Sequence, residues 1–213
     1  MKNLLRYAMC LAMQLQLLAL QAQVFTAQNI PDSIWTRMQG RSYPQECGIA
    51  RSELRYLELS HYDFDGEEHI GQMVCNRQIA DDLLYIFRKL YEAEYPIARM
   101  RLIDDYDASD QRSMADNNTS CFCYRRIAGS ETLSKHSRGM AVDVNPLYNP
   151  CLYVRSGRVL PSEGKAYAYN RSKRKDIPGM IDVSDLCYRL FLSRGFRWGG
   201  SWRSLKDYQH FEK

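Results

Sequence analysis

The sequence predicts an α+β domain with an antiparallel β-sheet and two main helices. Residues 54–63 and 68–75 alternate between apolar and polar side chains on either side of the turn Phe64-Asp65-Gly66, a pattern typical of a β-hairpin. Apolar residues recur at helical spacing over residues 77–93, and again in a segment that ends at Arg194. Because no internal repeat or linker divides the sequence, we expect one domain.

Composition and charge agree with a globular protein. Of the 213 residues, 45% are apolar and 25% are charged, which excludes a disordered protein, a collagen and a polytopic membrane protein. The formal net charge is +4, and Lys2 and Arg6 contribute two of these charges. The remaining charge is too small to predict nucleic acid as a partner.

Residues 1–27 have the pattern of a secretory signal peptide. A basic start precedes a mostly apolar stretch over residues 7–20, so we expect cleavage after Ala22 or Ala27 and a mature domain over residues 28–213. The apolar stretch is shorter than the ~20 residues that cross a bilayer, which argues against a permanent membrane anchor. A buried amphipathic helix is the alternative. The expected location is therefore secreted or periplasmic.

The cysteines fit an exported protein. Without Cys10 in the signal peptide an even number remains, which suits an oxidising compartment and allows 15 complete pairings. Sequence does not choose among these pairings, and some of the thiols can instead be small buried apolar groups. No C-x-x-C pair is present, which argues against a thiolate zinc cluster. The six are Cys47, Cys75, Cys121, Cys123, Cys151 and Cys187.

The elements of the first half follow in order from these patterns. After the hairpin, Asn76 is the expected N-cap of the helix over residues 77–93. Pro96 ends this region, and we expect a strand over residues 97–103. The acidic run from Asp104 to Asp110 then predicts a solvated loop, since its spacing does not match a calcium-binding loop.

The second half predicts shorter strands and a long loop. We expect a short strand over residues 122–126 and a better one over residues 139–145, which has an apolar face and a face carrying Asp143. Residues 156–180 contain several Gly and Pro residues and predict a functional lid or mobile segment. Asp182 or Ser184 is the expected cap of the second helix. An aromatic-rich segment over residues 196–213 follows it and ends the sequence.

The residues suited to catalysis concentrate in two segments. Around His136 the sequence reads S-x-H-x-x-G-x-A-x-D and ends at Asp143, and near the C-terminus a second motif, D-x-x-H, joins Asp207 to His210. Together they supply two imidazoles, a carboxylate to complete a ligand set, and a spare carboxylate. Two histidines and one carboxylate with an open position make up a catalytic zinc site, whereas structural zinc uses four protein ligands.

These two motifs resemble those of the zinc D-alanyl-D-alanine carboxypeptidases and the related L-alanyl-D-glutamate endopeptidases of phage lysins. The resemblance runs from about Tyr56 to Glu212 and is strongest in Asn117–Arg125, His136–Pro150 and Trp198–Phe211. It implies the hedgehog/DD-peptidase-like fold, in which an antiparallel β-sheet and flanking helices surround one zinc cleft. It also implies that the substrates are peptidoglycan stem peptides.

Carried over residue by residue, the resemblance implies that His136, Asp143 and His210 bind Zn²⁺. It implies that Asp207 is the catalytic base and that Arg125 holds the substrate carbonyl or carboxylate. A single anionic ligand leaves the zinc site positively charged, which lowers the pKa of a water in the open position to about 7. The bond that is cut, by D,D-carboxypeptidase or L-alanyl-D-glutamate endopeptidase action, is left open.

Simpler roles remain possible for several of these residues. His136 and His210 can be structural histidines, Asp143 can cap a turn, and Asp207 can pair on the surface with Lys206 or Arg203. Arg126 can take the place of Arg125. His61 and His69 are expected to be ordinary hairpin residues, Trp198 and Trp202 to pack in the core or rim, and Arg171, Lys173, Arg174 and Lys175 to form a solvated loop face.

Two other classes of function compete with the enzyme. One is a zinc-bearing, non-catalytic extracellular binding module, because the hedgehog signalling domain shares the family fold. The presence of both Asp207 and Arg125 argues against this alternative. The other is a secreted structural protein held by disulfides, which would bind no stoichiometric metal.

Overall fold

The computed structural model describes residues 23–127, 130–174 and 176–213, and the expected signal sequence lies outside these residues except for its last five positions. Its strands are β1 Phe25–Gln28, β2 Leu54–Tyr62, β3 Glu68–Asn76, β4 Ala141–Asp143, β5 Cys151–Tyr153, β6 Val159–Leu160, β7 Arg197–Trp198, β8 Leu205–Asp207 and β9 His210–Glu212. Its α-helices are α2 Asp32–Met38, α3 Ala80–Glu92, α4 Asp110–Ala115 and α5 Leu186–Ser193.

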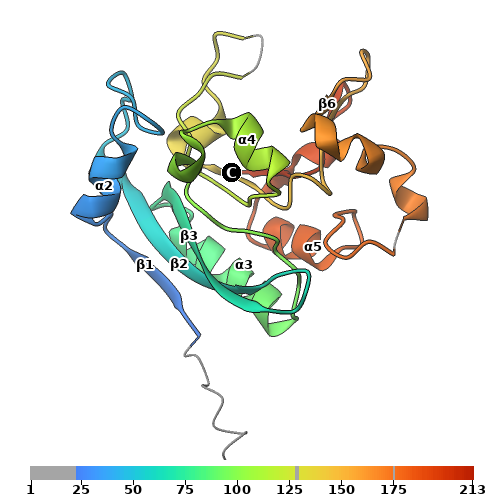
Figure 1. Ribbon diagram of the computed structural model, residues 1–213, viewed down its shortest axis with the longest axis horizontal. Coiled ribbons are helices and arrows are strands. Elements are labelled where there is room, and N and C mark those ends of the chain that lie inside the picture. Colours follow the sequence, from blue (N-terminus) through green and yellow to red (C-terminus); the bar gives the residue numbers. More distant parts are fainter. Residues whose placement is uncertain (1–22, 128–129, 175) are drawn as a thin grey trace, which may run out of the picture.

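The strands form three small antiparallel sheets, in the orders β1-β2-β3, β4-β9-β7 and β6-β5-β8. The α+β class with antiparallel strands is therefore confirmed, whereas the single sheet we expected is replaced by three. Figure 1 shows the long β2–β3 hairpin on one side of the molecule and the strands that follow residue 140 on the other. These later strands are two or three residues long, too short to continue one sheet across the domain.

The predicted hairpin is confirmed. Strands β2 and β3 pair along their whole length, from Leu54 opposite Asn76 to Tyr62 opposite Glu68. The turn between them is held by Asp63, whose Oδ1 accepts hydrogen bonds from the Asp65 and Glu67 amides at 2.9 and 3.0 Å. Strand β1 pairs with β2, so a signal cleavage after Ala27 would cut through this strand and cleavage after Ala22 would spare it.

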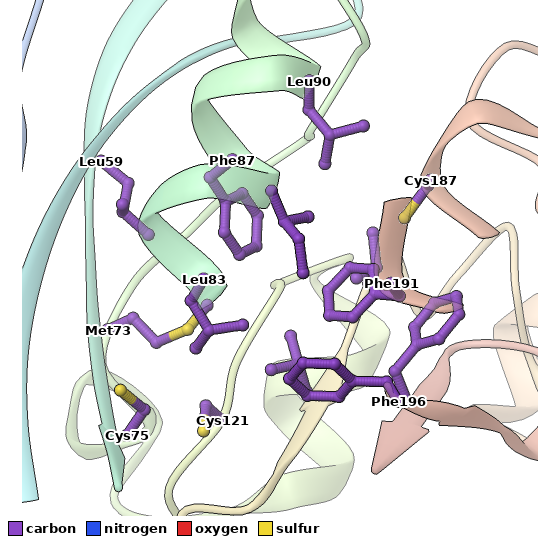
Figure 2. Packing of buried hydrophobic residues seen from close by; sticks show 14 of the residues in the cluster. Leu59, Met73, Cys75, Leu83, Phe87, Leu90, Cys121, Cys187, Phe191 and Phe196 are labelled. Carbon is purple, nitrogen blue, oxygen red and sulfur yellow. The ribbon is translucent and has the colours of Figure 1, made fainter. Parts of the chain in front are cut away.

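The main core lies between the hairpin and helices α3 and α5. Leu59 and Met73 point from the hairpin toward α3, and Phe87 of α3 meets Phe191 of α5 edge to face at 6.4 Å (Figure 2). Phe191 in turn stacks on Phe211 of β9 at 4.2 Å. Because aromatic pairs of this kind pack tightly, the C-terminal strand β9 is anchored in the core.

A second apolar cluster covers the other face of the hairpin. It joins β2 and β3 to α2 and to the segments around residues 102 and 122. None of the helices in the described residues is long and apolar enough to cross a bilayer. The buried members of this cluster are Ile30, Met38, Cys47, Leu54, Tyr56, Val74, Leu102 and Phe122.

Two helices begin later than expected. Helix α3 starts at Ala80, because Asn76 ends β3 and its Oδ1 accepts a hydrogen bond from the Gln78 amide in the intervening turn. Helix α5 is capped by Asp185, whose carboxylate accepts from the Cys187 amide at 2.8 Å, and not by either of the two residues we expected. Both helices keep the predicted apolar faces.

The segments 97–103 and 122–126 are extended but do not form strands. The Ala98 and Arg101 amides donate to the side chains of Asn145 and Asn118, at 3.0 and 2.8 Å. In the first segment asparagine side chains therefore supply partners that a neighbouring strand would supply, and each of the two segments makes only isolated bridges. The expectation that the acidic run is solvated is wrong at Asp104. Its carboxylate is buried and accepts hydrogen bonds from the Ser42 amide and hydroxyl at 3.1 and 2.9 Å.

The long loop over residues 156–180 is more ordered than its composition predicts. It contains β6 and two 3-10 helices, Ser162–Tyr167 and Arg171–Lys173. The Arg171 guanidinium is enclosed by backbone carbonyls, so its assignment to a solvated face was wrong. Lys173 is exposed as expected, and Lys175 lies outside the described residues.

The six cysteines named above are buried and free in the structure. None of the 15 pairings is therefore formed, and the alternative of small buried apolar groups describes these residues. Burial raises the pKa of the Cys75, Cys121 and Cys187 thiols, so these groups stay protonated in the core.

Stability is expected to fall in mild acid because of His61. This histidine lies opposite His69 in the hairpin and is 5% exposed, and burial lowers its pKa to about 4. Between pH 6.5 and pH 4 the unfolded protein binds more protons than the folded protein at this position, so stability is complete above pH 6.5 and falls as the pH drops. The expected loss is about 3 kcal/mol at pH 4. Urea unfolding across this pH range measures it.

In the variant His61→Gln, the free energy of unfolding should no longer fall by this amount between pH 6.5 and pH 4. The matched control is His69→Gln, because the His69 side chain is 50% exposed and pairs with Asp63 at 2.8 Å on the surface. Such an exposed pair contributes less than about 1 kcal/mol. Equal pH slopes in the wild type and His61→Gln would contradict the prediction.

Candidate active site

The structure brings together His136, Asp143 and His210, which we call the His–Asp–His group. Asp143 at the end of β4 pairs directly with His210 at the start of β9, and His136 lies on the 3-10 turn that precedes β4. His136 Nε2 lies 3.1 Å from Asp143 Oδ2 and 3.2 Å from His210 Nδ1. His210 Nδ1 lies 3.1 Å from Asp143 Oδ1.

Local sequence explains how His136 reaches this position. The Ser134 hydroxyl accepts a hydrogen bond from the His136 amide and so begins the 3-10 turn. Gly139 ends the turn at φ +63°, and a Cβ at this position would lie 2.6 Å from the Asn76 amide nitrogen. Glycine is therefore required between His136 and the strand that carries Asp143, as the sequence predicts.

Each imidazole has an outer partner that leaves one nitrogen free to face the centre of the group. His136 Nδ1 donates to the Cys121 carbonyl at 2.6 Å, and His210 Nε2 donates to the Glu212 carboxylate at 3.3 Å. The nitrogen that faces inward then has a lone pair in the neutral form. Outer partners of this kind orient histidines that bind metals.

The charges at the His–Asp–His group call for a cation. Burial opposes ionisation of Asp143, but the charges and hydrogen bonds of the two neighbouring histidines together outweigh burial and hold the pKa of Asp143 well below its usual range. Burial likewise opposes a charge on His210, but hydrogen bonds to Asp143 and Glu212 raise its pKa to about 10. A positive charge at this position, from a protonated His210 or from a metal ion bound between the three side chains, would balance the negative charge of Asp143 and Glu212.

The residues present fit a divalent metal ion. Within the described residues, the His–Asp–His group is the set of ligating side chains whose atoms lie close enough to share one ion. Ligand atoms about 2.0 Å from a tetrahedral metal lie about 3.3 Å apart, close to the observed separations. Two nitrogens and one carboxylate are also the ligand types of catalytic zinc sites, so the group could bind a metal.

Asp207 lies beside this group and is partly buried. It ends β8, three residues before His210, and its Oδ1 is buried without a hydrogen-bond partner among the described residues. Burial raises the pKa of Asp207 to about 6. Lys206 Nζ donates to the Gly200 carbonyl, so a surface pair with Asp207 does not form.

Arg125 is held in the same cavity by contacts to its backbone and side chain. Its amide donates to the Ser137 hydroxyl at 2.9 Å, and its guanidinium pairs with Asp110 of α4 at 3.1 Å. Its Nε is buried without a partner among the described residues. Arg126 pairs with Glu131 in an exposed loop and does not line the cavity, which removes it as an alternative.

The His–Asp–His group, Asp207 and Arg125 all line one cavity of about 450 Å³. Trp202 lies 5.4 Å from the His210 ring on its wall, whereas Trp198 is buried and donates to the Tyr208 carbonyl. The cavity also has apolar walls, formed by Ile127, Leu133, Tyr153, Leu160 and Leu205. This size and mixture of apolar walls with a few charged groups is typical of a ligand pocket.

Sequence reasoning missed two acidic residues that orient the site. Glu212 holds His210, and a signal for it was present because residues i and i+2 of a strand share a face. Asp110 holds Arg125, but the sequence placed it in a solvated loop. No local pattern relates Asp110 to an arginine fifteen positions away.

Removing the Glu212 carboxylate is expected to weaken metal binding. Outer partners of this kind contribute about 10- to 100-fold in metal affinity, so Glu212→Ala should lose affinity in this range. Glu212→Gln keeps an acceptor for His210 Nε2 and should lose less. Competition with a chelator of known zinc affinity measures the change.

The matched control is Arg197→Gln. Arg197 pairs with the other Glu212 oxygen at 2.7 Å and does not contact His210, so its loss should leave zinc affinity nearly unchanged. Equal affinities for the wild type and Glu212→Ala would show that Glu212 does not orient a ligand.

Comparison with known families supports this assignment of the site. Residues 128–213 match the D-alanyl-D-alanine carboxypeptidase family, and this segment contains the His–Asp–His group and Asp207. Arg125 and the hairpin precede it. No solved structure matches the protein. The segment that carries both motifs is therefore similar to the D-alanyl-D-alanine carboxypeptidase family, as the resemblance of the motifs predicts.

Proposed function

We propose that this protein is an exported zinc peptidase that hydrolyses peptide bonds in peptidoglycan stem peptides. The observation that carries the proposal is the buried Asp207 carboxylate, whose unpartnered oxygen lines the same cavity as the His–Asp–His group. A buried carboxylate oxygen without a hydrogen-bond partner costs stability, so its presence beside a potential metal site supports a role in the reaction.

In this proposal His136, Asp143 and His210 hold the zinc ion. When bound, zinc supplies a Lewis acid and lowers the pKa of water in its open position. His136 and His210 are oriented for this role by the Cys121 carbonyl and the Glu212 carboxylate. The carboxylate of Asp143 balances part of the positive charge.

Asp207 moves the proton. Its free Oδ1 accepts a proton from the attacking water as a C–O bond forms at the scissile carbonyl, and it returns this proton to the amine nitrogen as the C–N bond breaks. Burial raises the pKa of Asp207 above that of an ordinary aspartate, which makes it a stronger base. No covalent bond between protein and substrate is required.

Arg125 stabilises the negative charge on the substrate. Its ion pair with Asp110 and the clamp of Ser137 on its backbone fix the guanidinium before substrate binds. A fixed donor at a developing oxyanion, or at a substrate carboxylate, needs little reorganisation during the reaction. Burial opposes the charge on Arg125, but the combined attraction of Asp110 and of the other acidic groups in the cavity raises its pKa, so the group stays charged.

The test is to incubate the mature, zinc-loaded protein with defined stem peptides and to identify the products by mass spectrometry. We expect cleavage at one bond, which also distinguishes carboxypeptidase from endopeptidase action. Stoichiometric zinc and peptide binding without any product would favour the non-catalytic binding module. Absence of bound zinc would overturn both the peptidase and the zinc-bearing binding module.

A further inference from the structure

A second cavity of about 550 Å³ adjoins the catalytic one. The two share Leu133, Lys135 and Arg138 in their walls, and Lys135 and Arg138 are the first and last residues of the 3-10 turn that carries His136. This single turn therefore separates the His–Asp–His group from the second cavity. Its other lining side chains include Tyr124 and Met140.

The second cavity has an excess of positive charge. Lys135 Nζ donates to the Lys213 main-chain oxygen at 3.2 Å, and Lys213 Nζ pairs with Asp82 at 2.7 Å. Glu53 is the acidic residue of the lining, and its carboxylate accepts from the Ala50 amide at 3.0 Å. These groups are engaged within the protein.

Arg138 differs from its neighbours. It is exposed, and its guanidinium has no ion pair or hydrogen bond with any residue that the structure describes. A guanidinium offers planar pairs of donors that match a carboxylate in bidentate fashion. The unpartnered cation at the boundary of the two cavities is therefore free for an anionic ligand.

We propose that the second cavity is a subsite for a carboxylate-bearing residue of the peptide substrate, and that Arg138 binds this carboxylate. This inference rests on the proposed function and deepens it, because substrate would extend beyond the catalytic cavity. Arg138 ends the 3-10 turn that carries His136, so a peptide bound in the catalytic cavity can continue past this turn into the second cavity.

The experiment uses a synthetic stem peptide and versions in which each carboxylate in turn is an amide. We expect one amide version to bind the wild type about tenfold more weakly, through KM and not kcat. In Arg138→Gln the acid and that amide version should have equal KM values. The control Arg155→Gln removes an exposed arginine that lines neither cavity and should keep the wild-type preference.

Calorimetry with zinc-loaded Asp207→Asn separates this inference from the proposed function. The same peptides can then be compared by affinity even where no peptide is hydrolysed. An acid preference that disappears on adding Arg138→Gln supports the subsite whether or not cleavage occurs. Equal affinity for all amide versions, or an unchanged preference in Arg138→Gln, would overturn it.

Discussion

Replacing Asp207 by asparagine is expected to lower kcat about 1,000-fold while leaving zinc content unchanged. Asparagine is nearly the same size but cannot take a proton from water, so the general-base step is lost. Asp207 is not part of the His–Asp–His group, and the ligand atoms of that group keep their contacts. Steady-state turnover of the cleaved stem peptide and elemental analysis measure the two quantities.

The same substitution is expected to stabilise the metal-free protein at pH 7. Burial raises the folded-state pKa of Asp207 to about 6, so the folded protein binds more protons than the unfolded protein between about pH 4 and pH 6. Stability from this group is therefore present in acid and is lost as the pH rises through 6. Asparagine has no such loss, and urea unfolding at pH 7 should show a higher midpoint.

The control for both effects is Lys206→Gln. Lys206 precedes Asp207 on β8, but its ammonium donates to the Gly200 carbonyl and takes no part in the proposed reaction. We expect its kcat to stay within a few-fold of the wild type. If Asp207→Asn kept wild-type turnover, the base would have to be another group.

The His–Asp–His group could be predicted from sequence because its residues lie in two short motifs that resemble those of the carboxypeptidase family. His136 and Asp143 are seven positions apart, and Gly139 between them makes the required turn. Asp207 and His210 are three positions apart around the β8–β9 turn. The pairing of β4 with β9 joins the two motifs. The alternation of apolar and polar side chains in each strand permits this pairing but does not specify it.

The rest of the site depends on contacts that no local pattern contains. Asp110 meets Arg125 from a separate helix, and the Cys121 carbonyl meets His136 across fifteen positions. The extended segment 97–103, which failed as a strand, shows the same limit, because Asn118 and Asn145 complete its hydrogen bonds from elsewhere in the sequence. Propensity predicts an extended backbone, but partners decide whether it becomes a sheet.

Arg171 fastens the long loop to the body of the domain. Its guanidinium donates to the Tyr148, Tyr167 and Ile181 carbonyls at 2.8 to 2.9 Å and to the Asn149 side chain at 2.8 Å. Its charged plane also lies 4.1 Å from the centre of the Tyr208 ring. Burial lowers the pKa of Arg171 to about 10, so it remains charged at neutral pH.

Replacing Arg171 by leucine is therefore expected to lower the free energy of unfolding by about 3 kcal/mol, measured in urea at pH 7. Leucine fills part of the space but leaves buried acceptors without donors. Arg171→Lys keeps the charge, yet one ammonium cannot reach all four acceptors, so it should lose roughly half as much. The control is Arg174→Leu, whose guanidinium donates to the Ala166 carbonyl at an exposed position and should cost less than about 1 kcal/mol.

The position of Tyr208 extends this effect to the candidate active site. Tyr208 follows Asp207 and lies two residues before His210, so loss of the stacked guanidinium should loosen the β8–β9 turn. We therefore expect Arg171→Leu to lower turnover as well as stability at a temperature where the protein is still folded. If instead Arg171→Leu and Arg174→Leu unfolded at the same urea concentration, the prediction would be wrong. The loop would then be held by its other contacts, and water would hydrogen-bond the carbonyls around residue 171.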